Sequence, residues 1–131
     1  MTIFNFDSNT SVVLVNAKLS GPKRVHTIRM ILDTGASYTL VNPEALAFAG
    51  YDLAVETQRR RITTASGIEY VPFITVTEIA ALGQQVANVA VCGHSLPGGL
   101  PAEGLLGLNF LRHFNVHLNF LDGQLEIISR I

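Results

Sequence analysis

The chain of 131 residues has little of several features on which whole classes of protein depend. It has a single cysteine, Cys92, so an intrachain disulfide framework is excluded and a reducing compartment is permitted. Charged residues make up 15% of the chain and the formal net charge is -1, so no strong field favours nucleic acid or an anionic membrane. We therefore expect no nucleic-acid partner.

Long apolar runs are also missing. No stretch approaches the roughly 18 uninterrupted apolar residues of a membrane-spanning helix. Residues 1–7 lack the basic and apolar segments of a signal peptide. We therefore expect a soluble, cytoplasmic protein without a membrane segment, although a fragment of an anchored protein would look the same. Hydrophobic residues make up 48% of the chain, enough for a core, and the length predicts one domain over residues 1–131.

Helical periodicity is scarce, and short apolar segments separated by turn residues predict strands instead. The main expected strands cover residues 11–19, 24–32, 59–64, 68–77, 114–120 and 124–131. Asn42, Pro43 and Gly50 are typical of the two ends of a short helix, here over residues 43–49. The apolar run 105–111 predicts a strand that leads into a helical turn. The pattern indicates an all-β domain with one or two short helices.

One polar motif follows an apolar strand at residues 28–32. It consists of Asp33, Thr34 and Gly35 and continues with Ala36 and Ser37. A carboxylate in a tight loop at the end of a buried strand is well placed for chemistry. In the alternative interpretation the motif is a plain turn, in which Asp accepts backbone amide hydrogens and Gly takes a positive φ. The motif occurs once, and the other aspartates lie in no such context: Asp7, Asp52 and Asp122.

Three segments, in order along the chain, resemble the retropepsin-like aspartic proteases, the single-lobe relatives of pepsin. Residues 33–37 resemble their catalytic loop. The hairpin tipped by residues 65–67 falls where that family has its flap, and residues 105–111 resemble its second signature, two apolar residues and a glycine followed by a short helix. The resemblance covers roughly residues 24–131. It implies a closed β-barrel of the acid-protease type with a flap hairpin.

The resemblance also implies an aspartic endopeptidase, which hydrolyses peptide bonds with two carboxylates that face each other across one water. Like charges a few ångströms apart resist ionising together, so the pair shares one proton, and aspartic proteases are themselves the standard example. Because this chain has one copy of the motif, the resemblance implies a homodimer in which two copies of Asp33 meet on the two-fold axis. It implies a peptide or protein substrate, and no metal or other cofactor is expected.

Further roles follow residue by residue from the resemblance. Thr34 is expected to hydrogen-bond to the loop of the second subunit, Gly35 to let the backbone approach the substrate, and Ser37 to support the site. The expected flap and pocket contacts are Ala36, Ala65, Ser66, Gly67, Leu105 and Leu106. For the two leucines, plain core packing is an equal alternative.

The chain departs from the viral members of the family at two positions. Ser37 stands where they carry Asp, and Leu108 stands where they carry Arg. Both members of a charged pair are thus replaced together by uncharged residues, so no charge is left without its partner. Substrate preference and dimer strength therefore cannot be copied from viral enzymes. A second class of function stays open: a catalytically silent peptide-binding or dimerisation module on the same fold.

Other polar groups favour structural roles. His113 and His117 are four residues apart, a separation of ~13 Å along a strand and too long for one metal ion. We expect Cys92 to be a buried or inert thiol. The basic residues 59–61 predict a solvated strand face, which could still bias substrate choice toward acidic peptides.

The terminal strands are apolar and would be an aggregation hazard in an isolated lobe. The hypothesis that follows from this is burial in an intersubunit sheet. The side chains concerned are Leu125, Ile127 and Ile128 or their neighbours.

Overall fold

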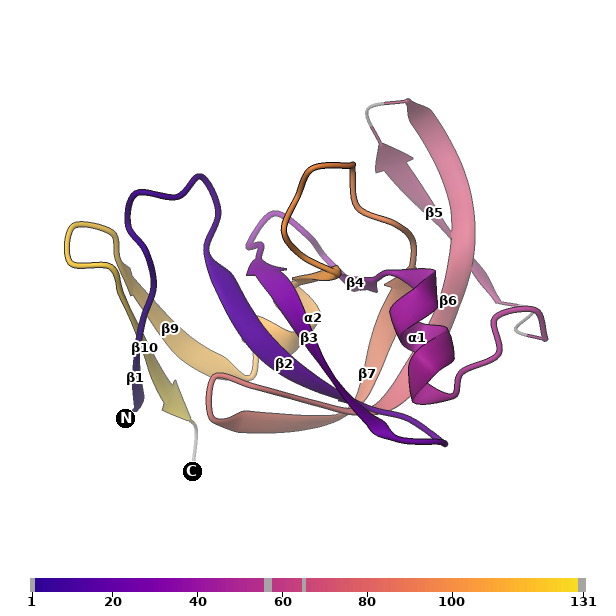
Figure 1. Cartoon of the computed structure of the whole chain (residues 1–131), viewed down its shortest axis with the longest axis horizontal. Helices are drawn as coiled ribbons and strands as arrows, with labels where there is room; N and C mark the ends of the chain where they lie inside the picture. The colour runs from indigo at the N-terminus through magenta and orange to yellow at the C-terminus, as the bar shows by residue number, and fades with distance from the viewer. Residues whose placement is uncertain (1, 56–57, 65, 130–131) are drawn as a thin grey trace.

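The computed structural model describes residues 2–55, 58–64 and 66–129, and strands dominate it (Figure 1). The strands are β1 (Thr2–Asn5), β2 (Leu14–Ser20), β3 (Val25–Leu32), β4 (Thr39–Val41), β5 (Arg59–Thr64), β6 (Gly67–Ala81), β7 (Gln84–Gly93), β8 (Gly104–Leu106), β9 (Phe114–Asn119) and β10 (Gln124–Ser129). The helices are α1 (Pro43–Ala49) and α2 (Leu108–Leu111). The all-β expectation with short helices is confirmed.

A closed barrel forms the body of the molecule. Its strands lie in the order β2, β3, β8, β4, β7 and β6. The ring closes because β2 also pairs with the far end of β6, where Ala17 lies opposite Ala81. The pairs β3–β8 and β4–β7 are parallel, and the other pairs are antiparallel. The expected closed barrel is therefore confirmed.

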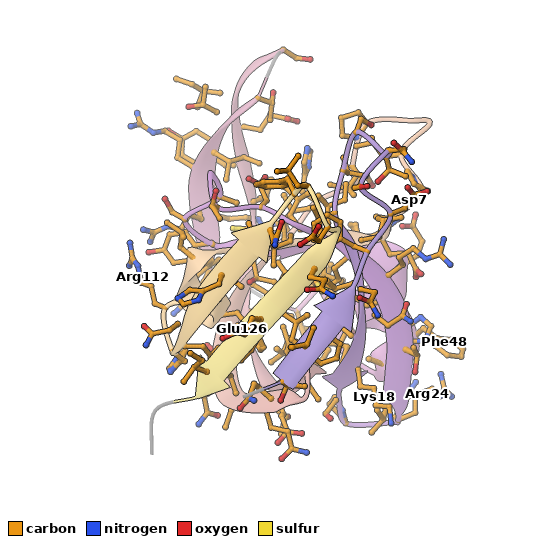
Figure 2. All side chains as sticks on the ribbon, turned by 90° about the vertical axis from the view of Figure 1, so that its left-hand side faces the viewer. Asp7, Lys18, Arg24, Phe48, Arg112 and Glu126 are labelled. Atoms are coloured by element: carbon orange, nitrogen blue, oxygen red, sulfur yellow. The ribbon has the colours of Figure 1, made fainter. Side chains whose placement is uncertain are left out.

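A second, smaller sheet covers one end of the barrel, at the left of Figure 1, and faces the viewer in Figure 2. Its order is β1, β10, β9, so β10 lies in the middle. The side chains of Leu125 and Ile127 are 1% and 0% exposed and belong to the same core cluster as the barrel residues. The expectation of intersubunit burial is thus wrong for these two, because the inner face of β10 packs on its own barrel. Ile128 is 36% exposed.

Local sequence signals predicted both ends of the helix α1 correctly. The side chain of Asn42 accepts a hydrogen bond from the backbone N–H of Glu44 at 3.0 Å, and Pro43 occupies the first turn. Gly50 ends the helix with a φ of 112°, which a residue with a Cβ rarely adopts.

No helix within the described ranges is both long and apolar enough to cross a membrane.

The hairpin of β5 and β6 projects from the barrel at the upper right of Figure 1. The strand β5 pairs with the first part of β6, from Thr64 opposite Gly67 to Arg59 opposite Pro72. The second part of β6, from Phe73 onward, pairs with β7 inside the barrel. One long strand therefore links the barrel to this projecting hairpin, which is called the flap hairpin below. Ala65, at the expected tip, lies outside the described residues.

Candidate active site

The loop with Asp33 begins where β3 ends, beside the end of β8. The two strands are parallel, and Leu32 lies opposite Leu106. The carboxyl ends of parallel neighbours meet at one edge of a sheet, so the segments that follow them lie side by side. The backbone N–H of Asp33 donates to the carbonyl of Leu106 at 3.0 Å, and that of Leu108 donates to the carbonyl of Ala36 at 2.8 Å. Two of the expected motifs, residues 33–37 and 105–111, are thereby joined.

The carboxylate of Asp33 is half-buried and oriented by its own loop. Its Oδ1 accepts a hydrogen bond from the backbone N–H of Gly35 at 2.8 Å. A Cβ on residue 35 would lie 3.2 Å from the same oxygen, so a glycine here lets the loop fold closely around the carboxylate. Among the residues that the structure describes, no partner bonds the second oxygen of Asp33. The geometry leaves that oxygen available for an external ligand.

Thr39 and Asn109 brace the two loops from beneath, and sequence reasoning missed both. The Thr39 side chain is fully buried. Its hydroxyl and its backbone N–H each donate to Oδ1 of Asn109 at 2.8 Å, while the hydroxyl accepts from the N–H of Gly107 at 3.1 Å. The amide nitrogen of Asn109 donates to the carbonyl of Ala90 at 2.6 Å. A lone polar residue inside the apolar run 105–111 was the signal that could have found Asn109.

Gly107 is needed because the loops approach so closely. A Cβ there would lie 2.8 Å from the carbonyl oxygen of Ala36 and 2.8 Å from backbone atoms of Tyr38. Backbone cannot rotate aside as a flexible side chain can, so a larger residue would push the Asp33 loop outward. The second motif therefore supports the first through backbone contact.

The other expected site residues lie at different depths. Thr34, Gly35 and Ser37 are exposed, although they lie in a loop that the barrel holds firmly. Ala36 and Leu105 are partly buried, whereas Leu106 is fully buried and packs in the core of this subunit. The exposed edge of the loop offers polar and backbone groups for contact with another molecule.

The flap hairpin carries the remaining expected residues at its tip. Ser66 and Gly67 are exposed, and Gly67 has a φ of 124°. The hydroxyl of Thr64 accepts from the N–H of Ser66 and donates to the carbonyl of Gly67, both at 3.2 Å. The structure places the hairpin where the sequence predicts it, and the described residues at its tip are exposed.

Arg60 connects the base of the flap hairpin to the Asp33 loop. Its guanidinium donates to the hydroxyl of Tyr38 at 2.6 Å and lies over the rings of Tyr38 and Phe73. The sequence predicted a solvated basic strand face over residues 59–61, and it did not predict the stack of Arg60 on Tyr38. Spacing along one strand carries no information about a loop far away in the sequence.

Cys92 lies inside the protein, whereas His113 and His117 lie on its surface. Cys92 is buried, and this burial raises the pKa of its thiol, while the positive charge of Arg60 acts in the lowering direction. His113 and His117 are exposed, and His117 lies 4.0 Å from the carboxylate of Glu126. Within the described part of the chain, no cluster of potential metal ligands is present.

A cation–aromatic pair lies on the outer surface of the protein, away from the Asp33 loop and residues 105–111. The guanidinium of Arg24 lies 4.2 Å from the ring centre of Phe48 and donates to the carbonyl of that residue (Figure 2). The ring of His26 meets the Phe48 ring edge to face, with 4.6 Å between the ring centres. These contacts hold α1 against β3, so a packing role accounts for them.

A closed barrel that joins an Asp-Thr-Gly loop to a second, glycine-containing loop defines the class of retropepsin-like aspartic proteases. The family described as "gag-polyprotein putative aspartyl protease" matches residues 16–113, and the chain belongs to this family. Among solved structures, a retropepsin-like aspartic protease from Rickettsia conorii is similar, with 23% identity and a TM-score of 0.74 over 95% of this chain and 87% of that chain. At this identity the likeness shows the fold. No curated protein sequence matches the chain.

Proposed function

We propose that the protein is an aspartic endopeptidase whose active site forms between two copies of the chain. The observation that carries the proposal is the oriented, half-buried carboxylate of Asp33 on an exposed loop. A single carboxylate of this kind is half of the group that the reaction needs, and membership of the family supports the other half coming from a second subunit.

In the proposed mechanism, two Asp33 carboxyl groups share one proton and hold a water between them, because their like charges resist joint ionisation. The ionised member takes a proton from the water as the oxygen attacks the peptide carbonyl. The protonated member hydrogen-bonds to the carbonyl oxygen, and the peptide C–N bond then breaks as a proton passes to the leaving amine. Thr34 holds the two loops together across the axis, Gly35 and Ser37 support the loop, and the tip of the flap hairpin closes over an extended peptide.

Two surfaces support a homodimer. The first is the exposed edge of the catalytic loop, with Thr34, Gly35 and Ser37. The second is the small sheet, in which β9 and β1 are the edge strands and present backbone groups that another strand can pair with. Phe120 and Leu121, in the turn after β9, are 62% and 96% exposed. Burying apolar side chains of this size would favour association.

The first test is the substitution Asp33→Asn in a peptide-cleavage assay. We expect kcat/KM to fall about 10²–10⁴-fold, because an amide cannot act as the general base. The matched control is Asp52→Asn: Asp52 is an exposed aspartate whose side-chain oxygen accepts a hydrogen bond from Ala54, and an amide oxygen preserves that contact. Undiminished cleavage by a correctly folded Asp33→Asn protein would contradict the proposal.

A mixing experiment tests the shared site directly. Wild type and Asp33→Asn are mixed in equal amounts and allowed to exchange subunits. If the site is shared, the mixture should have about a quarter of the activity of the same total amount of wild type, because only dimers of two wild-type subunits are active. Subunits that work alone would give about half. Sedimentation under the same conditions gives the state of association. Full activity from a strictly monomeric species would exclude the paired site, and peptide binding without cleavage by the wild type would favour the silent module.

A further inference from the structure

Arg60 is an exposed residue whose guanidinium is nevertheless held in a defined place. Its Nη2 donates to the hydroxyl of Tyr38 at 2.6 Å. Its Cζ lies 4.3 Å from the centre of the Tyr38 ring and 5.1 Å from that of Phe73, and the two rings meet edge to face at 5.2 Å. A planar cation fixed against aromatic rings has little freedom left to lose when it binds a ligand.

The stack around Arg60 lies at the end of the catalytic loop. Tyr38 directly precedes Thr39, which Asn109 fixes through two hydrogen bonds. Phe73 lies opposite Cys92 of β7, on the wall of the barrel. The guanidinium therefore has a set position relative to the loop that carries Asp33.

Strand alternation separates Arg60 from the neighbouring arginines. Successive side chains of β5 point to opposite faces of the hairpin, so Arg59 and Arg61 share the face away from Tyr38. Tyr70, directly opposite Arg61, is 69% exposed on that outer face. Val71, directly opposite Arg60, is buried. Arg60 thus places its charge on the inner face of the flap hairpin.

No carboxylate of the described ranges forms an ion pair with Arg60. Glu69 lies on the same inner face, but it is opposite Ile62, one step nearer the tip, and its carboxylate lies 3.4 Å from His94. Arginine has five N–H donors, and the bond to Tyr38 uses one of them. The guanidinium therefore has donors left for an anionic ligand.

Building on the proposed function, we propose that Arg60 determines specificity by binding the carboxylate of an aspartate or glutamate side chain in the peptide substrate. A peptide that lies extended between flap and catalytic loop passes the base of one flap on each side of the scissile bond. In a two-fold dimer the acidic preference appears at equal distances on both sides. Glu69, with its negative charge nearer the tip, disfavours acidic side chains closer to the cleaved bond.

The test uses pairs of peptides that differ only in Glu or Gln at one position, scanned along both sides of the cleaved bond. For the wild type we expect kcat/KM to be about tenfold higher for the Glu peptide at the position that meets Arg60, from one charge-assisted hydrogen-bond pair. The ratio should fall to about one in Arg60→Met, and Arg60→Glu should instead prefer a Lys peptide over its Gln counterpart. Arg61→Met makes the same change on the outer face and should keep the wild-type ratio.

A ratio near one in the wild type at every position, or an undiminished ratio in Arg60→Met, would overturn the assignment and leave the endopeptidase proposal intact. Tyr38→Phe is a milder variant that keeps the ring and loses the hydroxyl, and it should lower the ratio by roughly two- to threefold. If the wild type cleaves nothing, the proposed function fails separately. Binding of the same peptides to Asp33→Asn then decides: a Glu preference that Arg60→Met removes supports the role of Arg60, and equal binding overturns it.

Discussion

The Asp33 loop and the flap hairpin meet at the Tyr38–Arg60 contact, yet the fold holds them in different ways. The loop is bound to the barrel by backbone hydrogen bonds of Asp33 to Leu106 and of Leu108 to Ala36, and by the buried Thr39–Asn109 hydrogen bonds. The flap hairpin is one strand pair with an exposed outer face, held by side-chain contacts of Arg60 near its base and of Glu69 nearer its tip. Segments with few buried contacts open at low free-energy cost. We therefore expect a rigid loop for the chemistry and a flap that opens to admit substrate.

The largest expected effect comes from breaking the brace beneath the loop. Asn109→Ala leaves the N–H and hydroxyl of buried Thr39 and the carbonyl of Ala90 without their partner. Each unsatisfied buried group costs about 1–3 kcal/mol, so we expect the free energy of unfolding to fall by about 3–5 kcal/mol. Urea unfolding measures it. Asn115→Ala, at an exposed position of β9, is the control and should change stability by less than about 0.5 kcal/mol.

An equal loss of stability in the Asn109 and Asn115 variants would show that the brace is unimportant. A loss in Asn109→Ala without any fall in activity at low temperature would show that the loop keeps its shape without the brace.

The next largest effects come from replacing one glycine in each region, and the loss of stability is compared between them. Gly107→Ala forces a methyl group against backbone atoms of Ala36 and Tyr38, and overpacking of this kind costs about 1–3 kcal/mol. Gly67→Ala at the flap meets no atom within 4 Å, but its φ of 124° is strained for alanine. Because the hairpin end can relax, we expect a smaller loss of about 1 kcal/mol. Thermal unfolding ranks the two, and a larger loss at Gly67 would reverse the comparison.

The same pair should differ in kinetics. Gly107→Ala should move the Asp33 loop and lower kcat, whereas Gly67→Ala should change the closure of the flap hairpin and raise KM more than it lowers kcat. Gly98→Ala, in open space and without a positive φ, is the control for both and should behave as the wild type.

The smallest effect concerns Cys92, at the border of the two regions. Burial raises its thiol pKa above 9.0 in the folded protein, and the charge of Arg60 limits the rise. The thiol's contribution to stability is therefore complete below the unfolded pKa and is lost as pH rises through the raised folded pKa. We expect the free energy of unfolding to decline as pH rises above about pH 8, and to decline more in the wild type than in Cys92→Ala.

Unfolding curves at each pH measure this difference, and the comparison with Cys92→Ala removes the contribution of other groups that titrate there. In Arg60→Met the pKa should rise further, which moves the decline to higher pH. Identical pH profiles for wild type and Cys92→Ala would contradict the effect of burial.

The sequence by itself determined what depends on neighbours along the chain. Strand alternation, the caps at Asn42 and Gly50 and the turn glycines follow from local backbone preferences, and they predicted most strands and both helices. The single Asp-Thr-Gly motif likewise made Asp33 the candidate catalytic residue, because the motif and the apolar strand before it are contiguous. The strand β1 was missed, because four residues with weak alternation become a strand through pairing with β10.

Only the tertiary structure decided what depends on residues far apart. The hydrogen bonds of Thr39 to Asn109 span 70 positions, and the stack of Arg60 on Tyr38 spans 22. The inward packing of Leu125 and Ile127 likewise required knowing that β10 is a central strand and not an edge. Periodicity fixes which face of a strand is apolar, but the partner of that face is set by the closure of the barrel.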